Sequence, residues 1–268
     1  MDDLLRTLDG YLDAMPRAAT RTEALGPLTL FVNEAVGWRY YARPTPGAGP
    51  VSAGDVERAR ARQRELSQPE ALEWIVELVP SVGPAAAAAG MTVLEHSLMV
   101  LDSERATQAP PPAGIEVRLL TGADDLGLPQ ALAMVAFAHP GTETGPAGGE
   151  LLAAEGLRVP PGTAEFLAGR LERGQTVVAA AFVDGEPIGV GSHQPVGRVS
   201  EVAGVGVLPV FRRRGIGAAI TWFLVEDSRR RGIETVFLSA GDATIGRVYE
   251  GLGFRTVGRA GAAEVPEG

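Results

Sequence analysis

The sequence predicts a mixed α/β protein in two parts. Three observations predict it. Strand-like and helix-like segments alternate along all 268 residues, a proline-rich stretch at 106–114 follows an apolar strand, and a turn rich in glycine and arginine opens an apolar-faced helix in the second part. We therefore place a first α/β domain at residues 1–110 and a second domain at residues 114–268, with a linker between them.

The composition excludes several classes of protein. The chain has no cysteine and no lysine, which excludes a disulfide framework, a thiolate nucleophile, a Schiff-base lysine and a P-loop lysine. Its three histidines lie far apart, so we expect no metal site. A net charge of -9 argues against nucleic-acid binding, which needs a basic face. The N-terminus lacks signal-peptide order and no apolar run is long enough to span a bilayer, so we expect a cytoplasmic protein without a membrane partner.

The first part should contain two pairs of strands, each pair associated with helices. The expected elements are a helix at 1–20, two strands around a turn within 26–44, a charged helix at 52–67, and strands at 70–79 and 92–102 flanking a short helix that ends at Gly90. We expect Trp38, Tyr40, Tyr41 and Trp74 to serve a core or an interface rather than to stack on a ligand.

The second part alternates strands and helices more regularly. The expected elements are a strand at 115–120, a helix at 123–138, a mobile segment rich in glycine and proline at 139–163, a helix at 163–174, a hairpin turning at Asp184-Gly185, a strand at 199–209, a helix ending near Arg231, a strand at 234–240, a helix at 242–254 and a short strand at 255–260. Residues 71–101 and 234–259 share one order of strand, helix, glycine and strand, which indicates either a degenerate repeat or a coincidence of common units.

The stretch "VGVLPVFRRRGIGAAI", Val205 to Ile220, predicts an anion site. Pro209 ends a strand, and the following helix begins within 212–217, where its first N–H groups have no partner inside the helix. Gly215 and Gly217 allow a ligand to approach the backbone, and three arginines add charge. Together these features favour a phosphate, in particular a pyrophosphate. The stretch is neither a Walker A loop nor a dinucleotide fingerprint.

The stretch also resembles the acetyl-CoA signature of the GNAT (GCN5-related N-acetyltransferase) family, V-x-P-x-[FY]-R-x-x-G-[IVL]-G. The matching residues are Val207, Pro209, Phe211, Arg212, Gly215, Ile216 and Gly217. A later stretch, "VYEGLGF", resembles the family's second signature, whereas Arg213 stands where the family often has glycine. The resemblance covers about residues 115–260. It implies a mixed, mostly antiparallel sheet flanked by helices, with the first part as a smaller α/β domain, either accessory or a degenerate GNAT-like copy.

The resemblance implies acetyl-CoA as cosubstrate and no metal. The pyrophosphate is expected on N–H groups from Arg212 to Ala218, and the pantetheine arm beside the strand at 205–207, which a bulge near Gly204–Gly206 splays from the strand at 234–240. Asp242 stands where many relatives carry an asparagine that touches the CoA arm, and a helix-capping role for it remains open. The candidate cofactor-binding residues are Val205, Gly206, Val207, Arg212, Arg213, Arg214, Gly215, Ile216, Gly217, Ala218 and Asp242.

Two residues are candidates for catalysis. Tyr249 matches the family's usual general acid, although its helical face also fits a core tyrosine. Glu201, on the strand leading into the motif, is a candidate base for the attacking amine, or an ordinary strand-end charge; His193 is the rival base.

The predicted reaction is acetyl transfer from acetyl-CoA to a primary amine by direct attack. Two alternatives remain open: a non-catalytic acyl-CoA-binding sensor or regulatory protein, and a phosphate-binding regulator unrelated to CoA. The acceptor is expected to be a small-molecule or peptide amine bound near residues 139–163, and a homodimer is left open.

Overall fold

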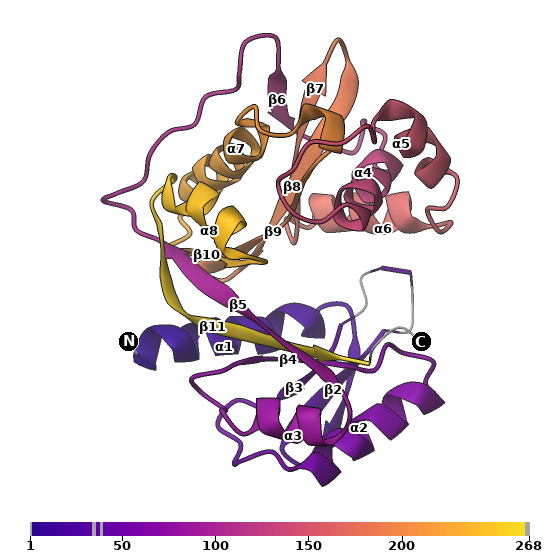
Figure 1. The fold of residues 1–268 in the computed structure, drawn as a ribbon, viewed down its shortest axis with the longest axis vertical. Coiled ribbons are helices and arrows are strands. Elements are labelled where there is room, and N and C mark those ends of the chain that lie inside the picture. The colour runs from indigo at the N-terminus through magenta and orange to yellow at the C-terminus, as the bar shows by residue number, and fades with distance from the viewer. Residues whose placement is uncertain (1, 34–35, 38–39, 266–268) are drawn as a thin grey trace. The chain divides into compact units, whose positions relative to one another are not determined.

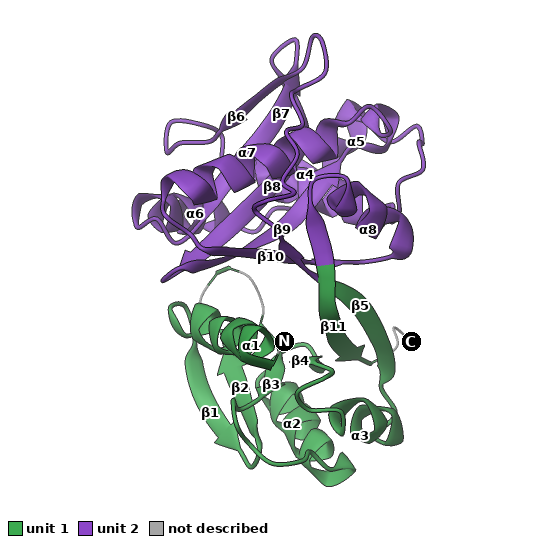
Figure 2. Ribbon diagram, turned by 90° about the vertical axis from the view of Figure 1, so that its left-hand side faces the viewer, with its two compact units in different colours: residues 1–98, 256–268 green, residues 99–255 purple. Residues whose placement is uncertain are grey.

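The chain forms two compact units. The computed structural model describes residues 2–33, 36–37 and 40–265. Unit 1 comprises residues 1–98 and 256–268, and unit 2 comprises residues 99–255 (Figure 2). Trp38 lies outside the described residues, whereas Trp74 is 2% exposed in the core of unit 1, as predicted.

In the part of the chain that the structure describes, unit 1 contains strands from one end of an 11-stranded sheet and a core of its own. Its strand order is β1-β2-β3-β4-β11-β5, and the pair β3–β4 is parallel at Ala42↔Leu72. The elements are α1 (Asp2–Arg17), β1 (Arg21–Leu25), β2 (Leu28–Val32), β3 (Ala42–Pro44), α2 (Ala53–Glu65), β4 (Ala71–Ile75), α3 (Val82–Ala88), most of β5 (Thr92–Leu101) and the later part of β11 (Phe254–Glu264) (Figure 1).

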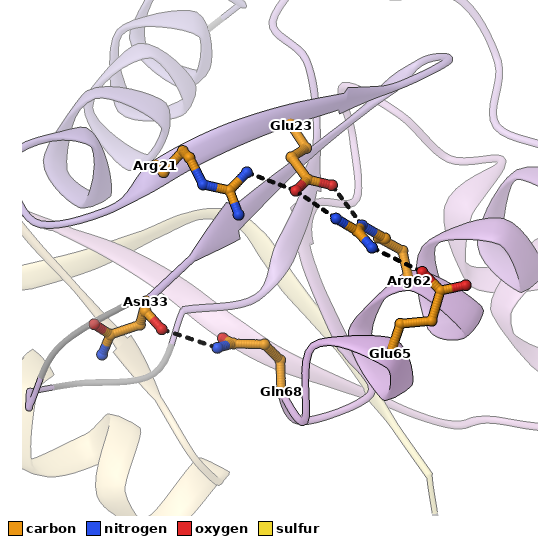
Figure 3. A network of polar contacts seen from close by, with 6 residues as sticks. All are labelled: Arg21, Glu23, Asn33, Arg62, Glu65 and Gln68. Carbon is orange, nitrogen blue, oxygen red and sulfur yellow. Dashed lines mark hydrogen bonds and ion pairs between the residues drawn. The ribbon is translucent and has the colours of Figure 1, made fainter.

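A polar network fastens α2 to the β1–β2 hairpin (Figure 3). Arg62 of α2 donates to both carboxylate oxygens of Glu23 on β1, at 2.7 and 2.9 Å, and Arg21 donates to the same carboxylate at 2.6 Å. These donors lower the pKa of Glu23 to about 2. Beyond the helix end, Gln68 donates to the carbonyl of Asn33 at 3.0 Å. The bidentate geometry fixes the orientation of the helix more than a single surface ion pair would.

Unit 2 contains strands from the other end of the sheet, with helices on both faces. Its strand order is β5-β10-β9-β8-β7-β6, with only the end of β5 contributing. The other elements are β6 (Glu116–Leu119), α4 (Gly127–Ala138), α5 (Gly149–Gly156), α6 (Thr163–Glu172), β7 (Val177–Val183), β8 (Glu186–Val196), β9 (Val199–Val207), the 3₁₀ turn η1 (Pro209–Phe211), α7 (Ile216–Arg230), β10 (Thr235–Ala240) and α8 (Ala243–Glu250) (Figure 1).

The two faces of this sheet pack into separate cores. Strand β7 shows the alternation: Val177 and Ala179 join a cluster with α7 and α8, while Val178 and Ala180 join a cluster with α4, α5 and α6. Ladders β6–β7, β7–β8 and β8–β9 are antiparallel, and β9–β10 is parallel. The predicted fold class, a mixed and mostly antiparallel sheet flanked by helices with a second α/β part, is confirmed.

The division between the units differs from the predicted domains at 1–110 and 114–268. Unit 2 already begins at Met99, and residues 256–268 belong to unit 1. The cause is β11, which was predicted to end near residue 260 but runs for 11 residues to Glu264. Its residues 260–264 pair antiparallel with β4. A side chain at Gly261 would lie 2.3 Å from the ring of Trp74, so glycine is required at this crossing.

Two elements were not predicted. Strand β1 carries the polar sequence Arg-Thr-Glu and lies at the sheet edge with no fully buried residue, so it lacks an apolar alternation. Helix α5 lies within the segment 139–163, where glycine and proline argue against a helix, and it buries only Leu152. The hairpin turn is confirmed, because Asp184 and Gly185 both have positive φ, at 50° and 83°.

The earlier and later parts of the chain, residues 21–101 and 177–264, repeat one order of elements. Each has a hairpin (β1–β2; β7–β8), a third strand antiparallel to the second (β3; β9), a helix (α2; α7), a strand parallel to the third (β4; β10), a helix (α3; α8) and a final strand (β5; β11). The repeated order therefore covers more than the segments 71–101 and 234–259 that first suggested it.

Within the described part of the chain, no helix is both long and apolar enough to cross a bilayer.

Candidate active site

The site begins where β9 and β10 part. Their parallel ladder runs from Val199↔Thr235 to Glu201↔Phe237, and β9 continues for six further residues. On its other side, β9 contains a β-bulge: Ala203 pairs with Ser192 and Gly206 with Val190, so two residues of β9 oppose Gly191 alone. Gly204 lies in the bulge with φ 65°, a left-handed conformation that favours glycine. The bulge expected near Gly204–Gly206 is confirmed.

The turn after β9 presents unpaired backbone donors. Pro209 opens the 3₁₀ turn η1, and helix α7 starts after Gly215, whose φ is 81°. The first hydrogen bond at this helix end is from the N–H of Ala219 to the carbonyl of Gly215, at 3.0 Å. Within the described residues, the six N–H groups from Arg213 to Ala218 have no acceptor, and no side chain caps the helix. This is the arrangement expected of an anion site.

Arg212, one of the predicted cofactor-binding residues, is hydrogen-bonded within the protein. Its own N–H donates to the carbonyl of Pro209 at 3.3 Å, so it is not one of the free donors. Its Nε donates to the carbonyl of Val207 at 3.0 Å, and the rest of the guanidinium donates to carbonyls at the end of α4 and beyond it. Burial lowers the pKa of this guanidinium, but it keeps its charge beside the turn. Its hydrogen-bonding groups are therefore used within the protein.

The next two arginines are exposed cations. Arg213 lies 3.5 Å from the carboxylate of Glu143 and has φ 60°, which explains why glycine suits this position. The guanidinium of Arg214 lies 5.4 Å from the ring centre of Phe211. Both cations lie next to the free N–H groups.

Each glycine of the motif occupies its position for a different structural reason. A Cβ on Gly206 would lie 2.8 Å from that of Ala136, so this glycine lets α4 pack closely on β9. A Cβ on Gly217 would meet Val205 and Val207 at ordinary distances of 3.8–3.9 Å. At Gly215 a side chain would meet no atom, but the left-handed backbone would be strained. Ile216 is buried and anchors the first turn of α7 in the core.

Asp242 caps helix α8. Its Oδ1 accepts from the N–H groups of Thr244 and Ile245, at 2.7 and 2.8 Å. The capping role that was left open is confirmed, and a contact with the CoA arm stays a prediction.

Tyr249 lies on α8 and packs against the core cluster of α7 and α8. Its ring meets that of Phe254 edge to face, with 5.9 Å between centres. Burial raises the pKa of its phenol to about 12. The phenol finds no hydrogen-bond partner among residues 2–33, 36–37 and 40–265. The packing expected of a core tyrosine is present, and the general-acid role of the hydroxyl stays a prediction.

Glu201 and His193 occupy opposite faces of the sheet. His193 is fully buried, with Nδ1 2.8 Å from Ser200 Oγ and Nε2 2.9 Å from Asp227 Oδ2 on α7. Burial lowers the pKa of His193 despite the carboxylate of Asp227, so the ring is neutral at pH 7. Ser200 faces α7, so strand alternation directs Glu201 to the α4 face, at the point where β9 and β10 part. His193 is thus a structural residue, and Glu201 keeps the position of a candidate base.

One set of contacts at the site was not revealed by the sequence. The segment from Ala136 to Gly148 reaches the turn through backbone groups, which leave no pattern in side-chain types. Among the described residues, no three histidine, aspartate or glutamate side chains are grouped closely enough to hold a metal ion.

Comparison with known proteins identifies the domain. Residues 153–254 match the sequence model described as the Acetyltransferase (GNAT) family. These residues form a GNAT-family domain. No curated protein matches the sequence. Family assignment supports acyl transfer as the general activity, and the GNAT family uses acetyl-CoA.

Solved structures of GNAT proteins share the fold of the whole chain. A GCN5-related N-acetyltransferase from Kribbella flavida is 20% identical, with a TM-score of 0.69 over 98% of this chain and 96% of its own. A tandem GNAT protein from the clavulanic acid biosynthesis pathway is 17% identical, with a TM-score of 0.57 over 100% of this chain and 97% of its own. A protein from Novosphingobium aromaticivorans, described as a putative acetyltransferase from the GNAT family, is 20% identical. Its TM-score is 0.53 over 92% of this chain and 91% of its own. At these identities the likeness concerns the fold.

Proposed function

We propose that unit 2 transfers an acetyl group from acetyl-CoA to a primary amine by direct attack. The observation that carries this proposal is the row of six unpaired N–H groups from Arg213 to Ala218, at the end of a strand that has parted from its neighbour. A pyrophosphate satisfies such donors and gains from the partial positive charge of the helix end. Arg213 and Arg214 supply full charges beside it.

The pantetheine arm is proposed to lie along β9. The N–H of Leu208 donates to Ile188 on β8, so in an antiparallel ladder the polar groups of Val207 point away from β8. Beyond Glu201, the described ladder no longer pairs β9 with β10. An amide-bearing arm can therefore add to β9 as a short extra strand, which brings the thioester toward Glu201 and Tyr249.

The chemistry needs one proton removed and one supplied. The amine nitrogen attacks the thioester carbon, the C–S bond breaks, and the amine loses a proton while the sulfur gains one. Glu201 is proposed to accept the amine proton, directly or through water. Tyr249 is proposed to protonate the sulfur. With its pKa at about 12 it stays protonated at neutral pH, and a thiolate leaving in the same buried surroundings becomes more basic for the same reason.

The acceptor is proposed to be a small-molecule or peptide amine that enters on the α4 face. Glu201 faces this side, and the segment 139–163 with α5 lies on it. Nothing on this face carries a signature of one amine class, so a broad amine screen follows a binding test.

The test is calorimetric titration of the purified chain with acetyl-CoA, with ADP as the control ligand, followed by thiol release on an amine panel. Selective micromolar binding of acetyl-CoA with turnover of at least one amine supports the proposal. Equal binding of ADP, or no binding, contradicts it. Selective binding without turnover on any amine indicates the acyl-CoA sensor instead.

A further inference from the structure

The guanidinium of Arg212 joins the cosubstrate turn to the acceptor side of unit 2. Besides the carbonyl of Val207, it donates to the carbonyls of Ala136 at 2.9 Å, His139 at 2.7 Å and Glu143 at 3.2 Å. One planar group thus holds four carbonyls from three places: the end of β9, the end of α4 and the segment after α4. A lysine has no fork of this shape and could not satisfy them together.

Backbone contacts continue the same junction. The N–H of Gly145 donates to the carbonyl of Pro209 at 3.3 Å, and the N–H of Val210 donates to the carbonyl of Ala147 at 3.2 Å. A Cβ on Gly148 would lie 3.2 Å from the side chain of Val210, so the segment lies close against η1. The segment 139–148 has no helix or strand of its own, so these contacts determine where it lies.

We propose that Arg212 is a positioning residue that couples acetyl-CoA binding to the order of the acceptor-side segment 139–148. This inference rests on the proposed function. A pyrophosphate held by the N–H groups from Arg213 onward restrains the turn, and the turn holds the segment through the adjacent Arg212. By linkage, an amine that orders the segment strengthens acetyl-CoA binding by the same factor.

The coupling differs from a simple charge effect. Glu143 also pairs through its side chain with Arg213 at 3.5 Å, but both side chains are mostly exposed, so that pair contributes little. The carbonyl of Glu143, in contrast, accepts from Arg212 and remains when the side chain is changed. Glu143→Gln therefore removes the exposed ion pair and preserves the junction, which makes it the matched control.

The experiment is hydrogen–deuterium exchange of the full chain with and without saturating acetyl-CoA. We expect exchange to slow at 213–218, where the ligand binds, and also at 139–148, by on the order of 10-fold. In Arg212→Gln and Arg212→Lys we expect slowing at 213–218 alone, whereas Glu143→Gln should behave as the unaltered chain. Thermal unfolding of each variant checks that it folds.

The outcomes separate this inference from the proposed function. The first outcome needs only the unaltered chain. If acetyl-CoA slows exchange at 213–218 but not at 139–148, the coupling is overturned and the acetyl-CoA site stands. Equal slowing at 139–148 in Arg212→Gln assigns the coupling to the backbone contacts and overturns the role of Arg212. No change at 213–218, together with no calorimetric binding, means that the proposed function itself has failed.

Discussion

The helices that join the parallel strands in the two units begin in opposite ways. In unit 1, α2 starts at Ser52, whose side chain accepts from the N–H of Asp55, while the carboxylate of Asp55 accepts from the N–H of Ser52 at 2.8 Å. In unit 2, α7 starts at Gly215 with no side-chain cap and no acidic residue in its first turn. The N–H groups at the start of the helix are thus capped by side chains in unit 1 and left without an acceptor in unit 2.

A second difference concerns the helices that follow the parallel strands, α3 after β4 and α8 after β10. Gly90 and Gly253 both follow that helix with positive φ, at 79° and 95°. Four residues before them, unit 1 has the buried Ala86 and unit 2 has Tyr249. At these two equivalent positions, unit 1 therefore has a capped helix end and an alanine instead of the open helix end and the phenol. The open helix end and the phenol on which the proposed chemistry depends both lie in unit 2.

The largest effect is expected from Tyr249→Phe. This change removes the proposed proton donor of unit 2, which has no counterpart at Ala86 of unit 1. We expect turnover to fall by about 100-fold, with acetyl-CoA affinity little changed, because the ring still packs against Phe254 while the hydroxyl is lost. Steady-state kinetics and calorimetry check this. A variant with unaltered turnover would remove Tyr249 from the mechanism. Because the pKa of the phenol is raised to about 12, its ionisation should not lower turnover below about pH 10.

Ala218→Asp transfers the acid of α2 to the equivalent third position of α7. A carboxylate there should satisfy the free N–H groups and repel a pyrophosphate, so we expect the Kd for acetyl-CoA to rise by about 10-fold or more. Ala218→Asn is the control of matched size without the charge. Calorimetry of both variants measures the difference. Equal losses of affinity would point to packing, since Ala218 touches the core cluster.

The reverse change, Asp55→Ala, removes the carboxylate half of the capping box of α2 and leaves the Ser52 half. We expect the free energy of unfolding to fall by about 1 kcal/mol at pH 7, without any gain of acetyl-CoA binding, because unit 1 has no arginine turn before its helix. The hydrogen bond from the Ser52 side chain, followed by that from the Ser52 backbone N–H, lowers the pKa of Asp55. A lowered carboxyl pKa stabilises the fold above its unfolded value of 3.8, so the difference between the two chains should shrink as pH falls below that value. Denaturant titrations at several pH values test this.

The smallest effect is expected from Arg213→Gly. Glycine relieves the left-handed φ of 60°, but it also adds freedom to the unfolded chain, so the free energy of unfolding should change by less than about 1 kcal/mol. Loss of the exposed cation should weaken acetyl-CoA binding only a few-fold, and more at low salt than at high salt. Calorimetry at two ionic strengths checks the salt dependence. Equal losses at both would exclude a charge effect.

Much of unit 2 follows from the sequence because its signals are local. The Asp184-Gly185 turn, the bulge at Gly204, the open start of α7 and the cap at Asp242 all depend on backbone preferences of single residues or short runs. Residue type and spacing were therefore enough to predict a turn with unpaired N–H groups, whereas Tyr249 as a candidate acid came only from the resemblance to the GNAT family.

Only the tertiary structure decided the rest, because it depends on partners that lie far apart in the chain. Strand β11 joins unit 1 through its pairing with β4 and the contact of Gly261 with Trp74. Alternation places His193 and Glu201 on opposite faces only once the register of β8 and β9 is known. Arg212 donates to backbone carbonyl groups, which every residue carries, so no sequence pattern predicts which carbonyls accept from it. The sequence by itself determined a GNAT-like turn with unpaired N–H groups, and the tertiary structure determined which distant groups that turn contacts.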